Sequence, residues 1–189
     1  MKRLVILGGG ESGVGAALLG KVKKYNVFLS DSGKIANKYK DVLIHNEIEW
    51  EEGGHTESEI LTADLVIKSP GIPDHVSIVQ KLQSATIPVV SEIEFAALFT
   101  TANIIGITGS NGKTTTTMMV YHILRQSGFD VAMGGNIGES FAEQVLTNTA
   151  HYVLELSSFQ LDGIQDFRPH IAVITNITPD HLDRYDYKF

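Results

Sequence analysis

A glycine-rich segment in the second half of the chain ends in the pair Lys113 and Thr114, and these residue types at this spacing suit phosphate chemistry. The segment follows an apolar run over residues 103–108 and opens a stretch of helical character over residues 113–127. Backbone N–H groups of such a loop can surround phosphate oxygens, while the lysine neutralises charge and the threonine hydroxyl binds a divalent cation. The candidate loop residues are Gly109, Ser110, Asn111, Gly112, Lys113, Thr114 and Thr115.

This loop is a shortened form of the common phosphate-binding pattern. The pattern G-x-x-x-x-G-K-[ST] requires glycine at the position that Ile107 occupies. The sequence that remains is T-G-S-N-G-K-T-T, and a Gly-Lys turn without a ligand is the alternative interpretation.

A second glycine-rich loop near the N-terminus fits G-x-G-x-x-G over residues 8–13, after an apolar run and before a helical stretch. Glycines let the backbone approach a phosphate, and Asp31 closes the next apolar run, where dinucleotide-binding folds place a ribose-binding carboxylate. The context favours a nucleotide-shaped ligand. Three interpretations of the loop remain open: a tight turn without a ligand, a dinucleotide site and a site for a UDP group. Glu11 makes the dinucleotide site less favourable, because its carboxylate would face the pyrophosphate.

Short apolar runs alternate with helix-compatible stretches along the chain, which predicts βαβ units and parallel sheets. We expect strands at residues 4–7, 27–31, 41–44, 64–68, 87–90, 103–108, 131–134, 151–156 and 171–175. Helices are expected at residues 13–25, 74–85, 113–127 and 140–147, and residues 91–101 are expected to be a short helix or a connector. The acidic segment 47–59 is expected to be a solvated loop. The predicted class is α/β: a Rossmann-like parallel-sheet domain over residues 1–92, then an incomplete P-loop-type α/β domain over residues 93–189.

Composition excludes several classes of protein. The 189 residues include no cysteine, so disulfides and thiolate metal sites are excluded. The net charge of −7 argues against nucleic-acid binding through a broad basic face. No apolar run approaches the roughly 20 residues of a membrane span, so we expect no membrane insertion and a cytoplasmic location.

Five motifs together resemble the Mur ligase family, and most of all its D-glutamate-adding members. The ATP-type loop T-G-S-N-G-K-T-T is shared with the wider Mur ligase and folylpolyglutamate synthase superfamily. The other motifs are S-P-G-I at residues 69–72, G-G-N-I-G at 134–138, E-L-S-S-F-Q-L at 155–161 and N-I-T-P-D-H-L-D-R-Y at 176–185. The resemblance covers the whole chain, with the motifs in the expected order.

The resemblance implies an ATP-dependent, amide-forming ligase of peptidoglycan synthesis. Such an enzyme adds D-glutamate to UDP-N-acetylmuramoyl-L-alanine through an acyl-phosphate intermediate, with ATP and Mg²⁺ as cofactors. It also implies a third domain that binds the incoming amino acid, and a carbamylated lysine beyond the last motif. Lys188 does not occupy the matching position, so we expect this chain to be an N-terminal part of the enzyme that is inactive alone.

The residues and the resemblance together assign roles to individual side chains. Glu155 ends an apolar strand, where a carboxylate is well placed to bind Mg²⁺. The resemblance implies metal contacts from Thr114, Glu155 and His181, and catalytic roles for Lys113 and His181. It implies substrate contacts from Glu11, Ser12, Gly13, Asp31, Ser32, Ser69, Gly71, Asn136, Ser157 and Gln160.

Three other functions remain as alternatives. Another Mur ligase is disfavoured by S-S-F-Q, and a folylpolyglutamate synthase-like ligase would lack the nucleotide-type N-terminal domain. A non-catalytic dinucleotide-binding module would leave the Lys113 loop unexplained.

Overall fold

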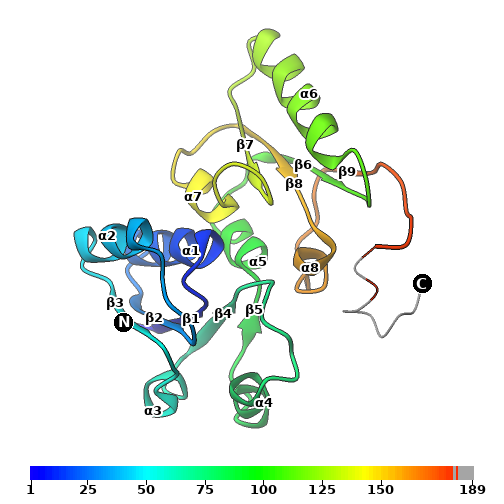
Figure 1. The fold of residues 1–189 in the computed structure, drawn as a ribbon. Coiled ribbons are helices and arrows are strands. Elements are labelled where there is room, and N and C mark those ends of the chain that lie inside the picture. The colour runs from blue at the N-terminus through cyan, green and yellow to red at the C-terminus, as the bar shows by residue number, and fades with distance from the viewer. Residues whose placement is uncertain (181, 183–189) are drawn as a thin grey trace.

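Two parallel β-sheets follow one another along the chain in the computed structural model, which describes residues 1–180 and residue 182 (Figure 1). Every strand pair in the described part of the chain is parallel. The predicted α/β fold with parallel sheets is therefore confirmed.

The first sheet has the strand order β3-β2-β1-β4-β5. The order changes direction between β1 (Arg3–Leu7) and β4 (Leu65–Lys68), and ligands of such sheets bind at this point, beyond the carboxyl ends of the strands. Register places Leu7 opposite both Ser30 and Lys68, so the segments after β1, β2 and β4 meet at one edge. The remaining strands are β2 (Asn26–Asp31), β3 (Glu49–Glu52) and β5 (Val89–Val90).

Helices cover both faces of the first sheet (Figure 1). Leu4 and Ile6 of β1 belong to the core cluster that includes α1, whereas Val5 and Leu7 pack in a second cluster with α3 and α4. This two-sided burial explains why β1 reads as a continuous apolar run rather than an alternating one. The helices are α1 (Glu11–Val22), α2 (Asn37–His45), α3 (Glu57–Ile60) and α4 (Ser77–Ser84).

Two local predictions in the first half are wrong. Residues 41–44 belong to helix α2, where only Leu43 is fully buried and the apolar residues recur at helical spacing. The acidic segment 47–59 contains strand β3 and helix α3 rather than a loop. Because β3 is an edge strand with half-buried residues, its sequence E-W-E-E carries too few apolar residues to be recognised.

The second sheet has the strand order β7-β8-β6-β9. Its strands are β6 (Asn103–Thr108), β7 (Val131–Gly135), β8 (His151–Glu155) and β9 (Ile171–Ile174), close to the predicted ranges. Its helices are α6 (Lys113–Gln126), α7 (Phe141–Val145) and the unexpected α8 (Ser158–Leu161).

Helix α5 (Glu92–Ala97) connects the two sheets and packs with α1 and α7 between them (Figure 1). The Tyr25 and Phe95 rings meet edge to face at 5.8 Å, and one apolar cluster extends through both halves. Gly15 of α1 lies so close to α7 that a Cβ atom would stand 1.8 Å from the Ser140 hydroxyl oxygen. The two halves are thus packed directly on each other, and the division into residues 1–92 and 93–189 stays a prediction.

Candidate active site

The loop between β6 and α6 adopts a backbone that only glycine accommodates well. Gly109 has φ of 134° and Gly112 has φ of 80°, and Gly112 is the N-cap residue of α6. Lys113 folds back over this loop, and its ammonium donates to the carbonyl oxygens of Gly109 at 2.7 Å and Ser110 at 3.1 Å. The lysine charge therefore lies beside the N-terminus of a 14-residue helix, where an anion is favoured.

Glu155 joins the loop to the neighbouring strand. The residue is 2% exposed, and its carboxylate accepts hydrogen bonds from the Thr114 hydroxyl at 2.7 Å and the Asn136 amide at 2.9 Å. Asn136 follows β7, Glu155 ends β8 and Thr114 follows β6, so three adjacent strands deliver these side chains to one sheet edge. Three residues singled out separately in the sequence are thus in direct contact.

The donor set at this edge suits Mg²⁺. A carboxylate and a hydroxyl are hard oxygen ligands, and Mg²⁺ is commonly held by one or two carboxylates together with phosphate oxygens and water. Among the described residues, no group of three His, Cys, Asp or Glu side chains could hold a metal ion by itself. Thr114 and Glu155 therefore fit a cation that a phosphate ligand helps to bind, rather than a closed protein site.

The segment after β9 holds the loop in place, which sequence reasoning missed. Asn176 accepts from the Asn111 N–H at 3.0 Å through its side-chain oxygen, and its amide donates to the Asn111 carbonyl at 2.9 Å. The Ser110 hydroxyl donates to the Thr178 carbonyl at 2.9 Å, and the Thr175 hydroxyl donates to Asn111 at 2.7 Å. The sequence feature that could have indicated this role is N-I-T at residues 176–178, the start of the last motif.

A cavity of about 430 Å³ opens beside this loop. Several predicted residues line it, namely Gly109, Ser110, Lys113, Asn136 and Ser157. Gln160 is instead engaged within α8: its side-chain oxygen accepts from the backbone N–H and hydroxyl of Ser157, forming a capping box. His181 and residues 183–189 lie outside the described residues.

The first glycine loop lies at the switch point of the first sheet. Asp31 accepts from the Gly9 N–H at 2.6 Å and the Gly33 N–H at 2.7 Å, so its carboxylate fixes two loops. A Cβ atom on Gly13 would stand 1.9 Å from the Gly8 carbonyl oxygen, which explains the glycine there. Glu11, Ser32 and Gly71 are exposed at this edge, and Ser12 is half-buried.

Ser69 carries a buried hydroxyl beside Gly8. A Cβ atom on Gly8 would stand 2.5 Å from this oxygen, which has no hydrogen-bond partner among the described residues. A buried hydroxyl without a partner costs free energy. The edge between β1 and β4 therefore holds, beside the glycine loop, a buried hydroxyl that lacks a partner among the described residues.

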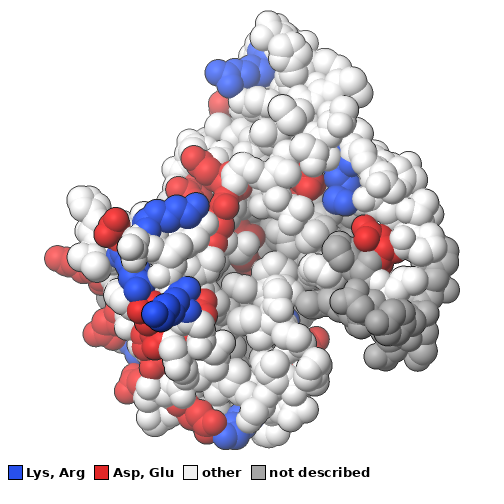
Figure 2. Space-filling view, in the orientation of Figure 1, with Lys and Arg blue, Asp and Glu red and all other residues white. Residues whose placement is uncertain are grey.

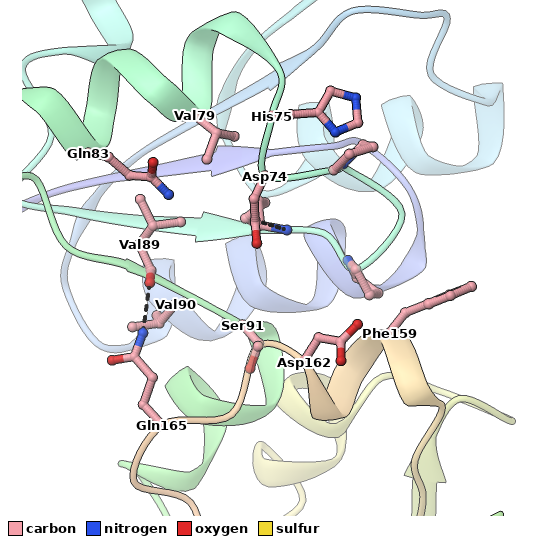
Figure 3. A pocket seen from close by; sticks show the side chains of 14 residues that line it. Asp74, His75, Val79, Gln83, Val89, Val90, Ser91, Phe159, Asp162 and Gln165 are labelled. Atoms are coloured by element: carbon pink, nitrogen blue, oxygen red, sulfur yellow. Dashed lines mark hydrogen bonds and ion pairs between the residues drawn. The ribbon is translucent and has the colours of Figure 1, made fainter. Parts of the chain in front are cut away.

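A larger cavity of about 730 Å³ lies between the two halves (Figure 3). Its lining comes from the β4–α4 segment, from β5 and from α8 and the turn after it. Lys68 forms an ion pair with Asp74 at 3.0 Å, and the Gln165 amide donates to the Val89 carbonyl at 3.2 Å. Phe159 lines both cavities. Pro70 and Phe159 belong to two of the motifs, but the sequence did not indicate the space between them, because its walls come from both halves.

Two carboxyls near the junction of the halves have raised pKa values. Burial, with a contribution from the Glu11 charge, raises the pKa of Glu92 to about 7, although the Ala142 N–H donates to it. Burial and the neighbouring Glu139 and Glu11 charges also raise the pKa of Glu143.

Charged side chains of both signs are intermixed over the first half in the space-filling view, and most of the second half is uncharged on this face (Figure 2). Within the described part of the chain, no helix has the length and apolar character that crossing a bilayer requires.

Two family models match successive parts of the chain. Residues 3–78 match the family model described as the MurD N-terminal domain, and residues 107–188 match the Mur ligase middle domain. UDP-N-acetylmuramoylalanine–D-glutamate ligase of Christiangramia forsetii is 62% identical over 188 residues, which are 99% of this chain and 42% of that protein. The Bacteroides thetaiotaomicron protein of the same name is 57% identical with the same coverage. The chain thus spans less than half the length of these relatives.

Solved structures share the fold at lower identity. A UDP-N-acetylmuramate:L-alanyl-γ-D-glutamyl-meso-diaminopimelate ligase of Neisseria superposes with a TM-score of 0.67 and 21% identity, covering 98% of this chain and 63% of its own. The UDP-N-acetylmuramate–alanine ligase MurC of Thermotoga maritima gives a TM-score of 0.65 and 22% identity, covering 100% of this chain and 44% of its own. With two matching family models, more than half of the residues identical to close relatives and a shared fold, the chain belongs to the Mur ligase family.

Proposed function

We propose that this chain supplies the UDP-substrate domain (residues 1–92) and the ATP-loop part of the middle domain (residues 93–189) of an enzyme that adds D-glutamate to UDP-N-acetylmuramoyl-L-alanine. The observation that carries the proposal is the contact of Thr114, Glu155 and Asn136 beside the Lys113 loop. This contact places an ammonium, two hard oxygen ligands and an amide at one sheet edge. The relatives at 57–62% identity carry that ligase name.

The first glycine loop serves the UDP group in this proposal. Backbone N–H groups at the N-terminus of α1 face the diphosphate, and the Ser69 hydroxyl, which has no hydrogen-bond partner among the described residues, serves the same ligand. Asp31 and Ser32 lie at the uridine end, where the Asp31 carboxylate also fixes the glycine loop. The exposed Glu11 side chain turns away from the diphosphate, because a carboxylate facing it would be repelled.

The second loop serves ATP. Lys113 leaves the Gly109 and Ser110 carbonyls and pairs with the phosphates, while Thr114 and Glu155 hold Mg²⁺, which supplies charge neutralisation on the phosphate oxygens. The alanine carboxylate of the substrate attacks the γ-phosphorus, ADP departs, and the D-glutamate amine then displaces phosphate from the acyl phosphate. The protein acts through positioning and charge stabilisation.

A chimera tests the proposal. This chain replaces the matching segment of the Christiangramia forsetii ligase, and phosphate release is measured with each substrate omitted in turn. We expect release that requires ATP, Mg²⁺, UDP-N-acetylmuramoyl-L-alanine and D-glutamate together. ATP turnover that ignores either acceptor substrate would contradict the proposal.

Calorimetry on the chain itself separates the proposal from a dinucleotide-binding module. The chain is titrated with UDP-N-acetylmuramoyl-L-alanine and, separately, with NADH. We expect heat of binding with the first ligand alone. Binding of NADH without binding of the UDP ligand would favour the module.

A further inference from the structure

Glu94 is a buried residue of α5 whose carboxylate accepts hydrogen bonds from three consecutive backbone N–H groups of the segment after α8. It lies in the first turn of α5 and is 7% exposed. Its oxygens accept from the N–H groups of Gln165 and Asp166 at 2.9 Å each, and from Phe167 at 2.9 and 3.2 Å. None of the ion pairs found among the described residues involves Glu94. Backbone donors therefore take the place of a cation.

The three donors would be difficult to satisfy in another way. Phe167 is buried in the apolar core beside Phe141, so water does not replace a lost partner for its N–H. Hydrogen bonds to an ionised acceptor are about twice as strong as those between neutral groups. A glutamine in this place has the same size but presents one acceptor oxygen, and its amide hydrogens would face other N–H groups.

The segment that Glu94 holds forms one wall of the cavity between the halves. Gln165 donates from its side chain to the Val89 carbonyl (Figure 3), and a Cβ atom on Gly163 would stand 2.9 Å from the Ser91 Cβ atom. The short helix α8, which carries Phe159, precedes this segment directly. Glu94 thus connects α5, which packs on α1 of the first half, to the wall that faces both cavities.

We propose that Glu94 is a positioning residue, which holds α8 and residues 163–167 against α5, the helix that packs on α1 of the first half, so that ligands bound to the two halves meet in productive alignment. The inference rests on the proposed function, because alignment matters only if a substrate on one half reacts with a nucleotide on the other. Glu94 lines neither cavity. It acts through the backbone segment that it holds.

The test substitutes Glu94→Gln in the chimera and measures steady-state kinetics. We expect kcat to fall at least about tenfold, since small misplacements of reacting groups are costly. The KM for ATP should stay within about threefold, because the Lys113 loop keeps its own contacts. The matched control is Glu92→Gln, two residues earlier on α5, where the buried carboxyl accepts one N–H, that of Ala142. This control should keep kcat within about twofold.

Amide hydrogen exchange on the chain tests the anchor without requiring the reaction. In the Glu94→Gln variant, the amide hydrogens of Gln165, Asp166 and Phe167 should exchange at least about tenfold faster. In the Glu92→Gln variant, their exchange rates should be unchanged. Unchanged exchange in Glu94→Gln would overturn the inference, as would a normal kcat despite faster exchange. Absence of turnover in the unsubstituted chimera would count against the proposed function, and the exchange result would still decide whether Glu94 is an anchor.

Discussion

Glu155 is the residue on which the site depends most, because both of its oxygens are already engaged by side chains that follow the two neighbouring strands. Thr114 and Asn136 donate to it, and the carboxylate is almost entirely removed from water. In the proposed function the same carboxylate binds Mg²⁺ beside the phosphates. Removing its charge should therefore affect catalysis far more than folding.

We expect Glu155→Gln in the chimera to reduce phosphate release about 100-fold or more, the range seen when a charge-stabilising group is lost. The amide can keep one of the two hydrogen bonds, so the thermal midpoint of the chain should fall by only a few degrees. Steady-state rates at several Mg²⁺ concentrations and a melting curve provide the measurement. Full activity at ordinary Mg²⁺ concentration would contradict the metal role.

Glu92 makes stability depend on pH. Its pKa is raised from 4.5 to about 7 in the folded chain, mainly by burial and then by the Glu11 charge. Between these values the folded state keeps a proton that the unfolded state has lost, so the free energy of unfolding falls as pH rises. The contribution of this proton to the free energy of unfolding is fully present below pH 4.5 and is lost as the pH rises through 7; it amounts to about 3 kcal/mol.

Glu92→Gln should remove this dependence, because an amide carries no charge at either pH. The free energy of unfolding of the variant minus that of the unsubstituted chain should therefore be larger at pH 8 than at pH 5, by a few kcal/mol. Urea unfolding at the two pH values measures the difference. Glu57→Gln, which removes an exposed partner of Lys81, serves as control and should change by less than about 1 kcal/mol. Equal pH profiles for the two variants would refute the assignment.

At the scale of elements, the segment after β9 and the Lys113 loop act as one unit. Asn176 makes two hydrogen bonds to the backbone of Asn111, and Thr175 and Thr178 add others. Asn176→Ala removes the two central contacts while leaving the lysine and the helix in place. The loop then has to be ordered by the nucleotide, which weakens binding.

We expect Asn176→Ala to weaken ATP binding to the chain about tenfold while the thermal midpoint shifts by only a few degrees. Calorimetric titration with ATP and Mg²⁺ measures the affinity. Asn46→Ala is the matched control, because it also removes an asparagine contact to a backbone carbonyl, that of Val42, at the end of α2. Equal ATP affinity in the two variants would show that the β9 segment does not organise the loop.

The extent to which sequence predicts this molecule differs between kinds of residue. Lys113, Thr114 and Glu155 were recognisable because glycine loops and strand ends have local signatures, and the structure brings them together. Glu94 acts through backbone groups distant in the sequence, so no local pattern marks it. Asn176 opens a recognised motif, but its contact with the Lys113 loop joins segments far apart in the sequence and could not be inferred from that motif. The strand β3 was missed because an edge strand needs little apolar surface. The sequence therefore predicts features that a short segment determines by itself, such as a glycine loop or a buried strand, but not contacts between distant segments.

At the scale of the whole molecule, the junction of the two halves depends on how closely α1 and α7 approach. Gly15 lies at this contact, and Ser140, the N-cap residue of α7, occupies the space where a side chain would begin. The Ser140 hydroxyl also accepts from the Glu143 N–H at 3.2 Å, so it cannot move without loosening the start of α7.

Gly15→Ala should therefore destabilise the chain by about 1–3 kcal/mol, the usual cost of overpacking, although alanine favours a helix more than glycine does. In the chimera it should also lower turnover, because α1 begins at the first glycine loop and α7 follows the segment that carries Asn136. Gly54→Ala is the matched control, since a Cβ atom there meets nothing within 4 Å. Urea unfolding and steady-state rates of both variants provide the measurement. A Gly15→Ala chain as stable and active as the control would mean that the two halves adjust their packing freely, and the alignment proposed for Glu94 would then need another source of rigidity.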